Sequence, residues 1–173
     1  MLQDRLMEGG ISMFYPKKLI VPVFVCAVLA GVGLHFLYAR FPCTLSALLS
    51  PVCESLWEHI KILYWPYLAA SAFLAWGRPT GMRPWLLSLV ILCPLMLVLG
   101  LLLHAALALH ALWLDIALYL GLMAFGFWFP VRFSGPFRGW RWRIPAILAF
   151  LLGALILLFT FFPPAGVLFA DLS

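Results

Sequence analysis

The feature that most constrains this chain is a series of five apolar stretches, each about as long as one crossing of a lipid bilayer. A spanning helix needs about 20 apolar residues, because each residue rises about 1.5 Å through a hydrocarbon layer about 30 Å thick. Of the 173 residues, 66% are hydrophobic and only 10% are charged, too few to cover a water-soluble globule. We therefore predict an all-α, polytopic membrane bundle of about five transmembrane helices, at Leu19–Ala39, Trp57–Trp76, Trp85–Leu109, Leu112–Pro130 and Ile144–Phe162.

The bundle is expected to form a single domain over residues 19–163, between an N-terminal segment, 1–18, and a tail, 164–173. The second stretch is the most polar of the five and contains Pro66. A kinked or partly re-entrant segment is therefore the alternative to a full span there.

The basic residues predict the orientation, because short cytoplasmic loops retain Lys and Arg during insertion. With five spans, nine of the eleven basic residues fall on the N-terminal side, namely Arg5, Lys17, Lys18, Arg78, Arg83, Arg132, Arg138, Arg141 and Arg143. We expect a cytoplasmic N-terminus and an extracytoplasmic C-terminus. The Trp-containing run Arg138–Arg143 is expected to contact anionic lipid headgroups, and nothing in the charge pattern requires nucleic acid.

The same topology places most of the other polar side chains on the outer half of the bundle. This group comprises all four histidines and four of the six carboxylates: His35, His59, His104, His110, Glu54, Glu58, Asp115 and Asp171. Ionisable groups at membrane depth are costly and usually face the bundle interior or a wet cavity. The outer half is therefore where we expect a functional site.

The strongest local feature is the run Glu54-Ser55-Leu56-Trp57-Glu58-His59-Ile60-Lys61. On a helix, Glu54, Glu58 and Lys61 would project within about 60° of one another, with His59 about 100° away from Glu58. The candidate catalytic residues are therefore Glu54, Glu58, His59 and Lys61, which could ligate a metal, relay a proton or shift one another's pKa. The alternative is a structural polar network, with Glu54 or Glu58 paired to Lys61 or Arg40.

A divalent metal is a further expectation, although the spacing matches no named metal motif. Its candidate ligands are Glu58, His59, His35, His104 and Asp115. Capping of the fourth helix is the alternative role for Asp115, because a carboxylate in the first turn of a helix is stabilised by the exposed backbone N–H groups.

Cysteine and glycine positions give weaker indications. Cys43 and Cys53 both lie in the first outer loop, where an oxidising exterior would permit a disulfide between them. Small residues allow helices to approach closely in membranes, and the glycines placed to do so are Gly31, Gly33, Gly121 and Gly126.

Three motifs resemble those of an uncharacterised family of small bacterial membrane proteins, known as domain of unknown function 6512. The first is the Glu54–Lys61 run followed by Tyr64-Trp65-Pro66. The second is Leu34-His35-Phe36-Leu37-Tyr38, and the third is Thr160-Phe161-Phe162-Pro163-Pro164 with Leu168, Phe169 and Asp171. The resemblance implies a multi-pass protein of the bacterial cytoplasmic membrane and assigns no chemistry.

Three functions are compatible with these observations. The first is a site that binds or processes a lipid or small amphiphile at the outer side, assisted by a metal. The second is a small proton- or ion-coupled transporter, for which intramembrane charges are typical. The third is an accessory or assembly subunit without chemistry of its own, which docks a membrane partner or a second copy of the chain.

Overall fold

The computed structural model describes residues 17–77, 81–109, 111–132 and 139–171, and every regular element among them is a helix. The five long helices are α1 (Lys17–Arg40), α3 (Leu56–Leu74), α4 (Arg83–Leu101), α5 (Leu112–Arg132) and α6 (Ile144–Phe161). Four short elements complete the fold: α2 (Thr44–Leu49), the π-helical turn η2 (Leu102–Ala106), and the 3-10 turns η3 (Trp140–Arg143) and η4 (Val167–Phe169).

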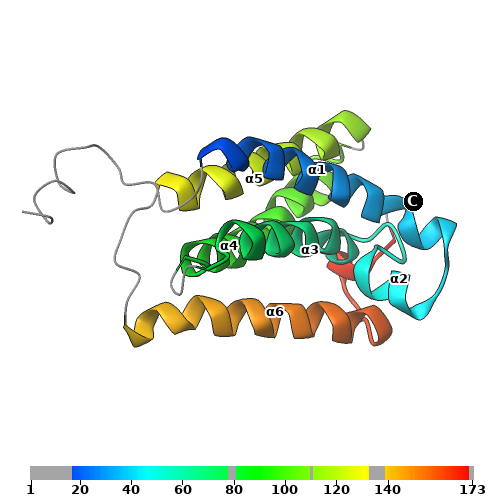
Figure 1. Cartoon of the computed structure of the whole chain (residues 1–173). Coiled ribbons are helices and arrows are strands. Elements are labelled where there is room, and N and C mark those ends of the chain that lie inside the picture. Colours follow the sequence, from blue (N-terminus) through cyan, green and yellow to red (C-terminus); the bar gives the residue numbers. More distant parts are fainter. Residues whose placement is uncertain (1–16, 78–80, 110, 133–138, 172–173) are drawn as a thin grey trace, which may run out of the picture.

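The long helices lie side by side and alternate in direction along the chain (Figure 1). The short element α2, the turn η2 and the C-terminal turn η4 consequently gather at one end of the bundle, which we call the α2 end. The turn η3 lies at the opposite end, where α5 finishes and α6 begins. The predicted positions of the five apolar helices agree with the observed helices to within a few residues, except that the third ends in the π-helical turn.

Four helices of the described chain are long and apolar enough to cross a membrane: Lys18–Arg40, Arg83–His104, Leu112–Arg132 and Trp140–Phe161. This indicates a membrane protein. The helix α3 is not among them, because its first turns carry the polar run Glu58-His59-Ile60-Lys61. Its full crossing of the membrane, and the orientation of the bundle, stay predictions.

The polar helix α3 lies at the centre of the bundle, which explains how it tolerates its composition. It contacts α1, α4, α5 and α6, and 12 of its 19 residues are buried. In the four apolar helices, by contrast, only 11% to 28% of the most apolar segment is buried. The apolar helices therefore surround α3 and separate its charged side chains from any lipid.

The core at the η3 end of the bundle is built from aromatic rings. The ring of Trp85 is fully buried and meets Phe127 edge to face with centroids 5.2 Å apart. Tyr67 contacts the same two rings, each at 5.7 Å. Such aromatic pairs add about 0.5–1.5 kcal/mol each beyond the area that they bury.

Tyrosine hydroxyl groups join neighbouring helices at backbone carbonyl groups. The hydroxyl group donates to the backbone carbonyl in each of three bonds: Tyr64 to Ala149 of α6 (2.9 Å), Tyr67 to Gly126 of α5 (2.6 Å) and Tyr119 to Val28 of α1 (3.2 Å). In an apolar interior a buried hydroxyl without a partner is costly, so each bond also fixes how two helices pack.

Glycines make room for these tyrosine rings. A Cβ at Gly31 would lie 2.5 Å from the backbone oxygen of Ile62 and would collide with the Tyr119 hydroxyl, and a Cβ at Gly126 would lie 2.8 Å from the Tyr67 ring. The prediction of close helix approach is therefore correct for Gly31 and Gly126. It is wrong for Gly33 and Gly121, because no atom of the described residues lies within 4 Å of a Cβ built at either position.

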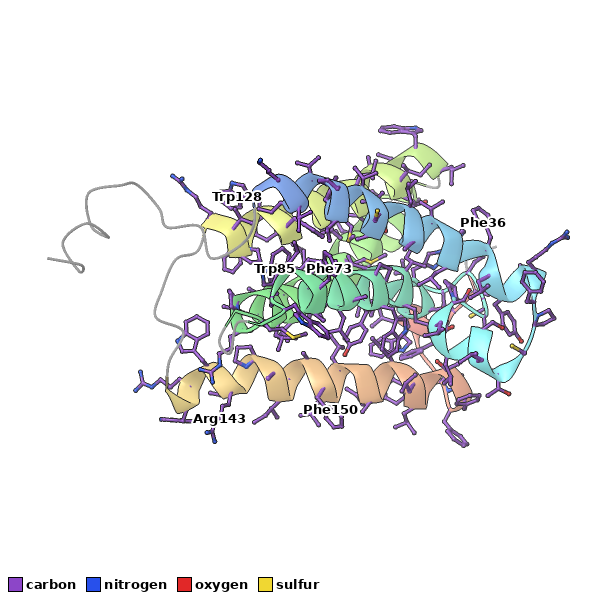
Figure 2. The ribbon with its side chains drawn as sticks, in the orientation of Figure 1. Phe36, Phe73, Trp85, Trp128, Arg143 and Phe150 are labelled. Atoms are coloured by element: carbon purple, nitrogen blue, oxygen red, sulfur yellow. The ribbon has the colours of Figure 1, made fainter. Side chains whose placement is uncertain are left out.

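Apolar side chains cover the outside of the bundle. Phe150 on α6 is 75% exposed and Leu29 on α1 is 64% exposed. Figure 2 shows Phe150 and Phe36 directed away from the bundle, while Trp85 lies inside it. A surface of this kind is stable in lipid and unstable in water, which agrees with the four membrane-length helices.

Candidate functional site

A cavity of about 550 Å³ lies toward the α2 end, between α1, α3, α5 and the end of α4 with its π-helical turn. Its size falls within the range of about 300–1,000 Å³ that is usual for small-molecule sites. Five ionisable side chains line it, His35, Glu54, His59, His104 and Asp115, together with Tyr119. The other lining residues are Val32, Phe36, Leu56, Ile62, Met96, Gly100, Leu112, Ile116 and Leu118.

The position of His59 is set by the first turn of α3. The helix begins after Ser55, whose hydroxyl accepts a hydrogen bond from the backbone N–H of Glu58 (3.3 Å). The Ser55 carbonyl oxygen lies 2.7 Å from Nδ1 of His59. A carbonyl can only accept, so Nδ1 carries the proton and donates it. The other ring nitrogen, Nε2, then points at the carboxylate of Glu54, with 3.2 Å between Nε2 and Oε2.

His35 reaches the same place from α1. Its ring centroid lies 5.2 Å from that of His59. The Nδ1 atom of His35 is buried and has no hydrogen-bond partner among the described residues. One potential ligand atom from each of His35, Glu54 and His59 lies within 4.8 Å of the other two. We call these three residues the His35 triad.

A second pair of polar groups lines the cavity from α4 and α5. His104 lies in the π-helical turn that extends α4, a local widening of the helix that is often found at functional sites. Its Nε2 lies 2.8 Å from Oδ1 of Asp115, which is in the first turn of α5. A carboxylate that holds an imidazole in this way fixes the ring and can support proton transfer.

Glu58 and Lys61 lie outside the cavity, in a buried ion pair with 2.6 Å between Nζ and Oε2. The Lys61 ammonium also donates to the carbonyl oxygens of Ala47 (2.8 Å) and Ser50 (3.3 Å), at the C-terminal end of α2. The Glu58 carboxylate accepts a further bond from the backbone N–H of Val52 (2.9 Å). The last carbonyl groups of a helix have no partner within the helix, and Lys61 supplies donors to them at the end of α2. Glu58 supplies an acceptor to the turn that follows.

Two other side chains hold the same loop. The indole N–H of Trp65 donates to the carbonyl of Leu48 (3.1 Å). The Ser50 hydroxyl bonds to the carbonyl of Leu34 and accepts from the backbone N–H of Tyr38 (3.1 Å), two groups that a regular helix joins directly. Ser50 thus attaches the loop to α1. No sequence signal marks this role, because a serine in a loop is common.

The structure separates residues that the sequence analysis grouped together. The prediction that Glu54 shares a helical face with Glu58 and Lys61 is wrong, because α3 begins at Leu56 and Glu54 precedes its N-cap. Glu54 turns instead toward His59. Of the five predicted metal ligands, Glu58 is absent from the cavity, while His59, His35, His104 and Asp115 all line it. His110 falls outside the described residues.

The predicted disulfide between Cys43 and Cys53 is not present, since both thiols are free. The Cys43 sulfur caps α2 instead, accepting a bond from the backbone N–H of Ser46 (3.5 Å). The Ser46 hydroxyl, 3.4 Å from the same sulfur, lowers the pKa of the Cys43 thiol together with that backbone N–H.

Within the predicted lipid-headgroup contact, Arg141 and Arg143 belong to η3 and are exposed, and Figure 2 shows Arg143 at the start of α6. Arg138 lies outside the described residues. The exposed ring of Trp140 lies in the same turn. This end of the bundle thus combines exposed arginine with tryptophan. Contact with anionic headgroups stays a prediction.

The fold and the cavity define a class of protein: a helical-bundle membrane protein with a polar cluster in a mostly apolar cavity at one end. The chain belongs to the family of unknown function DUF6512, whose family model matches residues 11–173. This confirms the family resemblance drawn from the sequence motifs. No curated protein and no solved structure matches the chain.

Proposed function

We propose that this membrane protein binds a lipid or other single-chain amphiphile in the cavity at the α2 end. The observation that carries the proposal is the lining of the cavity: nine of its fifteen residues are apolar or glycine, and five ionisable side chains also line it. Such a lining matches a molecule with a hydrocarbon part and a polar head. The hydrocarbon part would contact residues such as Met96 and Ile116, and the head would lie beside the His35 triad.

The surroundings of the cavity favour a ligand that arrives from the membrane. Several lining residues are also exposed on the outside of the bundle, among them Phe36 (62%), Leu112 (75%) and Ile116 (49%). An opening bordered by exposed apolar side chains faces lipid when the bundle is embedded. From the distribution of Lys and Arg, we place this opening in the extracytoplasmic leaflet of the cytoplasmic membrane, with the exposed arginines of η3 against anionic headgroups at the other side.

The test measures adducts of an uncharged amphiphile, monooleoylglycerol, by native mass spectrometry of the purified full chain. Met96→Trp adds bulk to the cavity lining. It is expected to weaken the affinity for the amphiphile at least about tenfold, a loss of about 1.4 kcal/mol of binding free energy. Val98→Trp is the matched control, because Val98 lies on the same helix, is 62% exposed and does not line the cavity. Equal binding by wild type and Met96→Trp would exclude the cavity as the binding site.

The two other functions have less support. A coupled transporter needs titratable groups along a path, but the buried pair Glu58 and Lys61 bonds to the loop around α2 rather than lining the cavity. Proton flux into proteoliposomes under a pH gradient would favour transport nevertheless. An accessory subunit would copurify with a defined membrane partner, whereas an amphiphile-binding protein is expected to bind its ligand alone or as a homo-oligomer.

A further inference from the structure

We propose that His35, Glu54 and His59 form a binding site for one divalent transition-metal ion, with Zn²⁺ as the reference ion. These residues come from α1, from the loop before α3 and from α3 itself, so the site exists only in the folded chain. Two imidazoles and one carboxylate are a ligand set that zinc and neighbouring metals accept. Two of these ligands, His35 and His59, are among the five metal ligands predicted from the sequence, and Glu54 replaces Glu58 as the carboxylate.

The hydrogen bond of His59 argues for a cation at this point. Because Nδ1 donates to the Ser55 carbonyl, a neutral His59 ring directs the lone pair of Nε2 at the Glu54 carboxylate, 3.2 Å away. Two acceptors that face each other at this distance repel unless a proton or a metal ion lies between them. The same Nδ1 bond is also the contact that usually orients a metal-binding histidine and fixes its tautomer.

The buried nitrogen of His35 favours a metal ion over a single proton. The His35 ring lies 5.2 Å from the His59 ring, and its Nδ1 is buried without a partner among the described residues. A proton shared by His59 and Glu54 alone would leave that nitrogen unbonded. A metal ion uses all three groups, because each contributes one lone pair. A buried polar atom without a partner is costly, and coordination through Nδ1 would remove that cost from the imidazole.

The spacing of the ligand atoms is close to what a metal requires. Bonds of about 2.0–2.1 Å in a tetrahedral site place ligand atoms about 3.4 Å apart. The distance from Nε2 of His59 to Oε2 of Glu54, 3.2 Å, already matches, and one potential ligand atom from each of the three residues lies within 4.8 Å of the other two. The Glu54 side chain is 51% exposed, so it is only partly enclosed by packed side chains.

Three protein ligands leave a fourth tetrahedral position for water or a ligand oxygen. All three residues line the cavity, so an acidic headgroup could supply that oxygen. This second step rests on the proposed function, whereas metal binding itself does not. We infer that the metal ion makes the cavity selective for amphiphiles with a carboxylate or phosphate head.

Metal binding is tested by titrating Zn²⁺ into the chelator-treated full chain, purified in detergent with a tag that contains no histidine. We expect one ion per chain, and we expect His35→Gln, Glu54→Gln and His59→Gln each to weaken binding about 100-fold, because loss of an outer contact alone costs about 10–100-fold. His104→Gln is expected to retain the ion. Unchanged thermal unfolding of each apo variant shows that the fold is intact.

Two results would overturn the site. One is a wild-type protein that binds no Zn²⁺, Mn²⁺, Fe²⁺, Co²⁺ or Ni²⁺ at micromolar concentration. The other is a folded His59→Gln variant with wild-type affinity. Loss of the ion in His104→Gln would reject the three-residue ligand set.

Headgroup selectivity is tested separately by comparing oleate with monooleoylglycerol, with and without Zn²⁺. The metal ion is expected to raise oleate binding at least about tenfold and to leave monooleoylglycerol binding unchanged, and His59→Gln should abolish the difference. Zinc binding without any effect on oleate supports the metal site and rejects the link to the amphiphile. Zinc binding by a protein that takes up neither amphiphile rejects the proposed function alone.

Discussion

Two pairs of residues in one short run of sequence, Glu54–Lys61, behave in opposite ways. Glu58 and Lys61 are buried (5% and 0% of the side chains exposed) and bonded to each other and to the loop around α2. Glu54 and His59 lie at a cavity and are 51% and 22% exposed. The first pair is bonded to backbone groups as well as to each other, while the second pair lies beside His35, which has a buried nitrogen without a partner in the described part of the chain.

Structural and functional polar residues in an apolar protein therefore differ in how completely their side chains are hydrogen-bonded. A buried charge is stable when paired and hydrogen-bonded, and the Lys61 ammonium achieves this with one carboxylate and two carbonyl oxygens. A polar cluster with incomplete hydrogen bonding beside a cavity is instead arranged for something that binds there. Charge and membrane depth alone do not separate the two cases.

The largest effect is expected from breaking the buried pair. Lys61→Met leaves the Glu58 carboxylate buried without its cation and removes the donor to Ala47 and Ser50. Loss of one partner of a buried pair costs about 3–5 kcal/mol. We expect a large fall in the midpoint of thermal unfolding in detergent.

Two further variants sharpen this comparison. The double change Glu58→Gln with Lys61→Met is expected to recover part of the loss, because no buried charge remains. His59→Gln, two positions before Lys61 on the same helix, is expected to cost less than about 1 kcal/mol, since its ring lies at the edge of a cavity. Equal losses for His59→Gln and Lys61→Met would contradict the division into a structural and a functional pair.

An intermediate effect is expected where α1 meets the cavity wall. Gly31→Ala places a methyl group against the Tyr119 hydroxyl and 2.5 Å from the backbone oxygen of Ile62. Overpacking of this kind costs about 1–3 kcal/mol, and because Tyr119 lines the cavity, amphiphile binding should also weaken. Gly33→Ala, two residues on, places its methyl group more than 4 Å from every neighbour that the structure describes, and is expected to be neutral or slightly stabilising. Equal midpoints of thermal unfolding for Gly31→Ala and Gly33→Ala would contradict the packing argument.

The smallest effect concerns Cys43, at the start of the loop that Lys61 holds. Hydrogen bonds from Ser46 lower the pKa of this exposed thiol, so more thiolate is present at a given pH. With every other cysteine changed to serine, labelling of Cys43 by a maleimide in detergent should therefore reach half its maximal rate at a lower pH than labelling of Trp76→Cys. Trp76 is an exposed position at the opposite end of the bundle. A higher half-point for Cys43 would show that the Ser46 contacts are absent.

The same two thiols test the orientation of the bundle. The variants are made in a background with Cys26, Cys53 and Cys93 changed to serine, because these thiols are also free. In sealed spheroplasts of cells producing the chain, an impermeant maleimide should label Cys43, and it should label Trp76→Cys, with Cys43→Ser in addition, only after the membrane is opened. The reverse pattern would place the cavity on the cytoplasmic side and overturn the assignment made from Lys and Arg.

Sequence reasoning recovered the helices because their signal is local. A run of about 20 apolar residues is a property of neighbouring positions, and the breaks between the runs are marked by Pro, Gly and charged residues. It also selected Glu54, His59, His35, His104 and Asp115, because ionisable residues are rare in such a chain. It could not assign partners to them, since Lys61 bonds to residues 11 and 14 positions away and Asp115 to a residue 11 positions away.

Two errors have physical causes that no local pattern reveals. The shared face of Glu54, Glu58 and Lys61 assumed that the helix extends back to Glu54, but Ser55 caps it and turns Glu54 toward His59. The disulfide between Cys43 and Cys53 assumed that nearness along the loop means contact, but Cys43 caps α2 instead. In both cases the hydrogen bonding of a helix N-terminus decided where a side chain points.

The sequence by itself determined that the chain is a bundle of apolar helices, where those helices lie and that its polar residues are concentrated in a few positions. These properties follow from composition and spacing, because lipid excludes unpaired polar groups. Only the tertiary structure decided that α3 is the central helix, that Glu58 and Lys61 hold the loop around α2, and that His35, Glu54 and His59 meet at a cavity. Those outcomes depend on contacts between different helices, which the order of residues along any one of them does not contain.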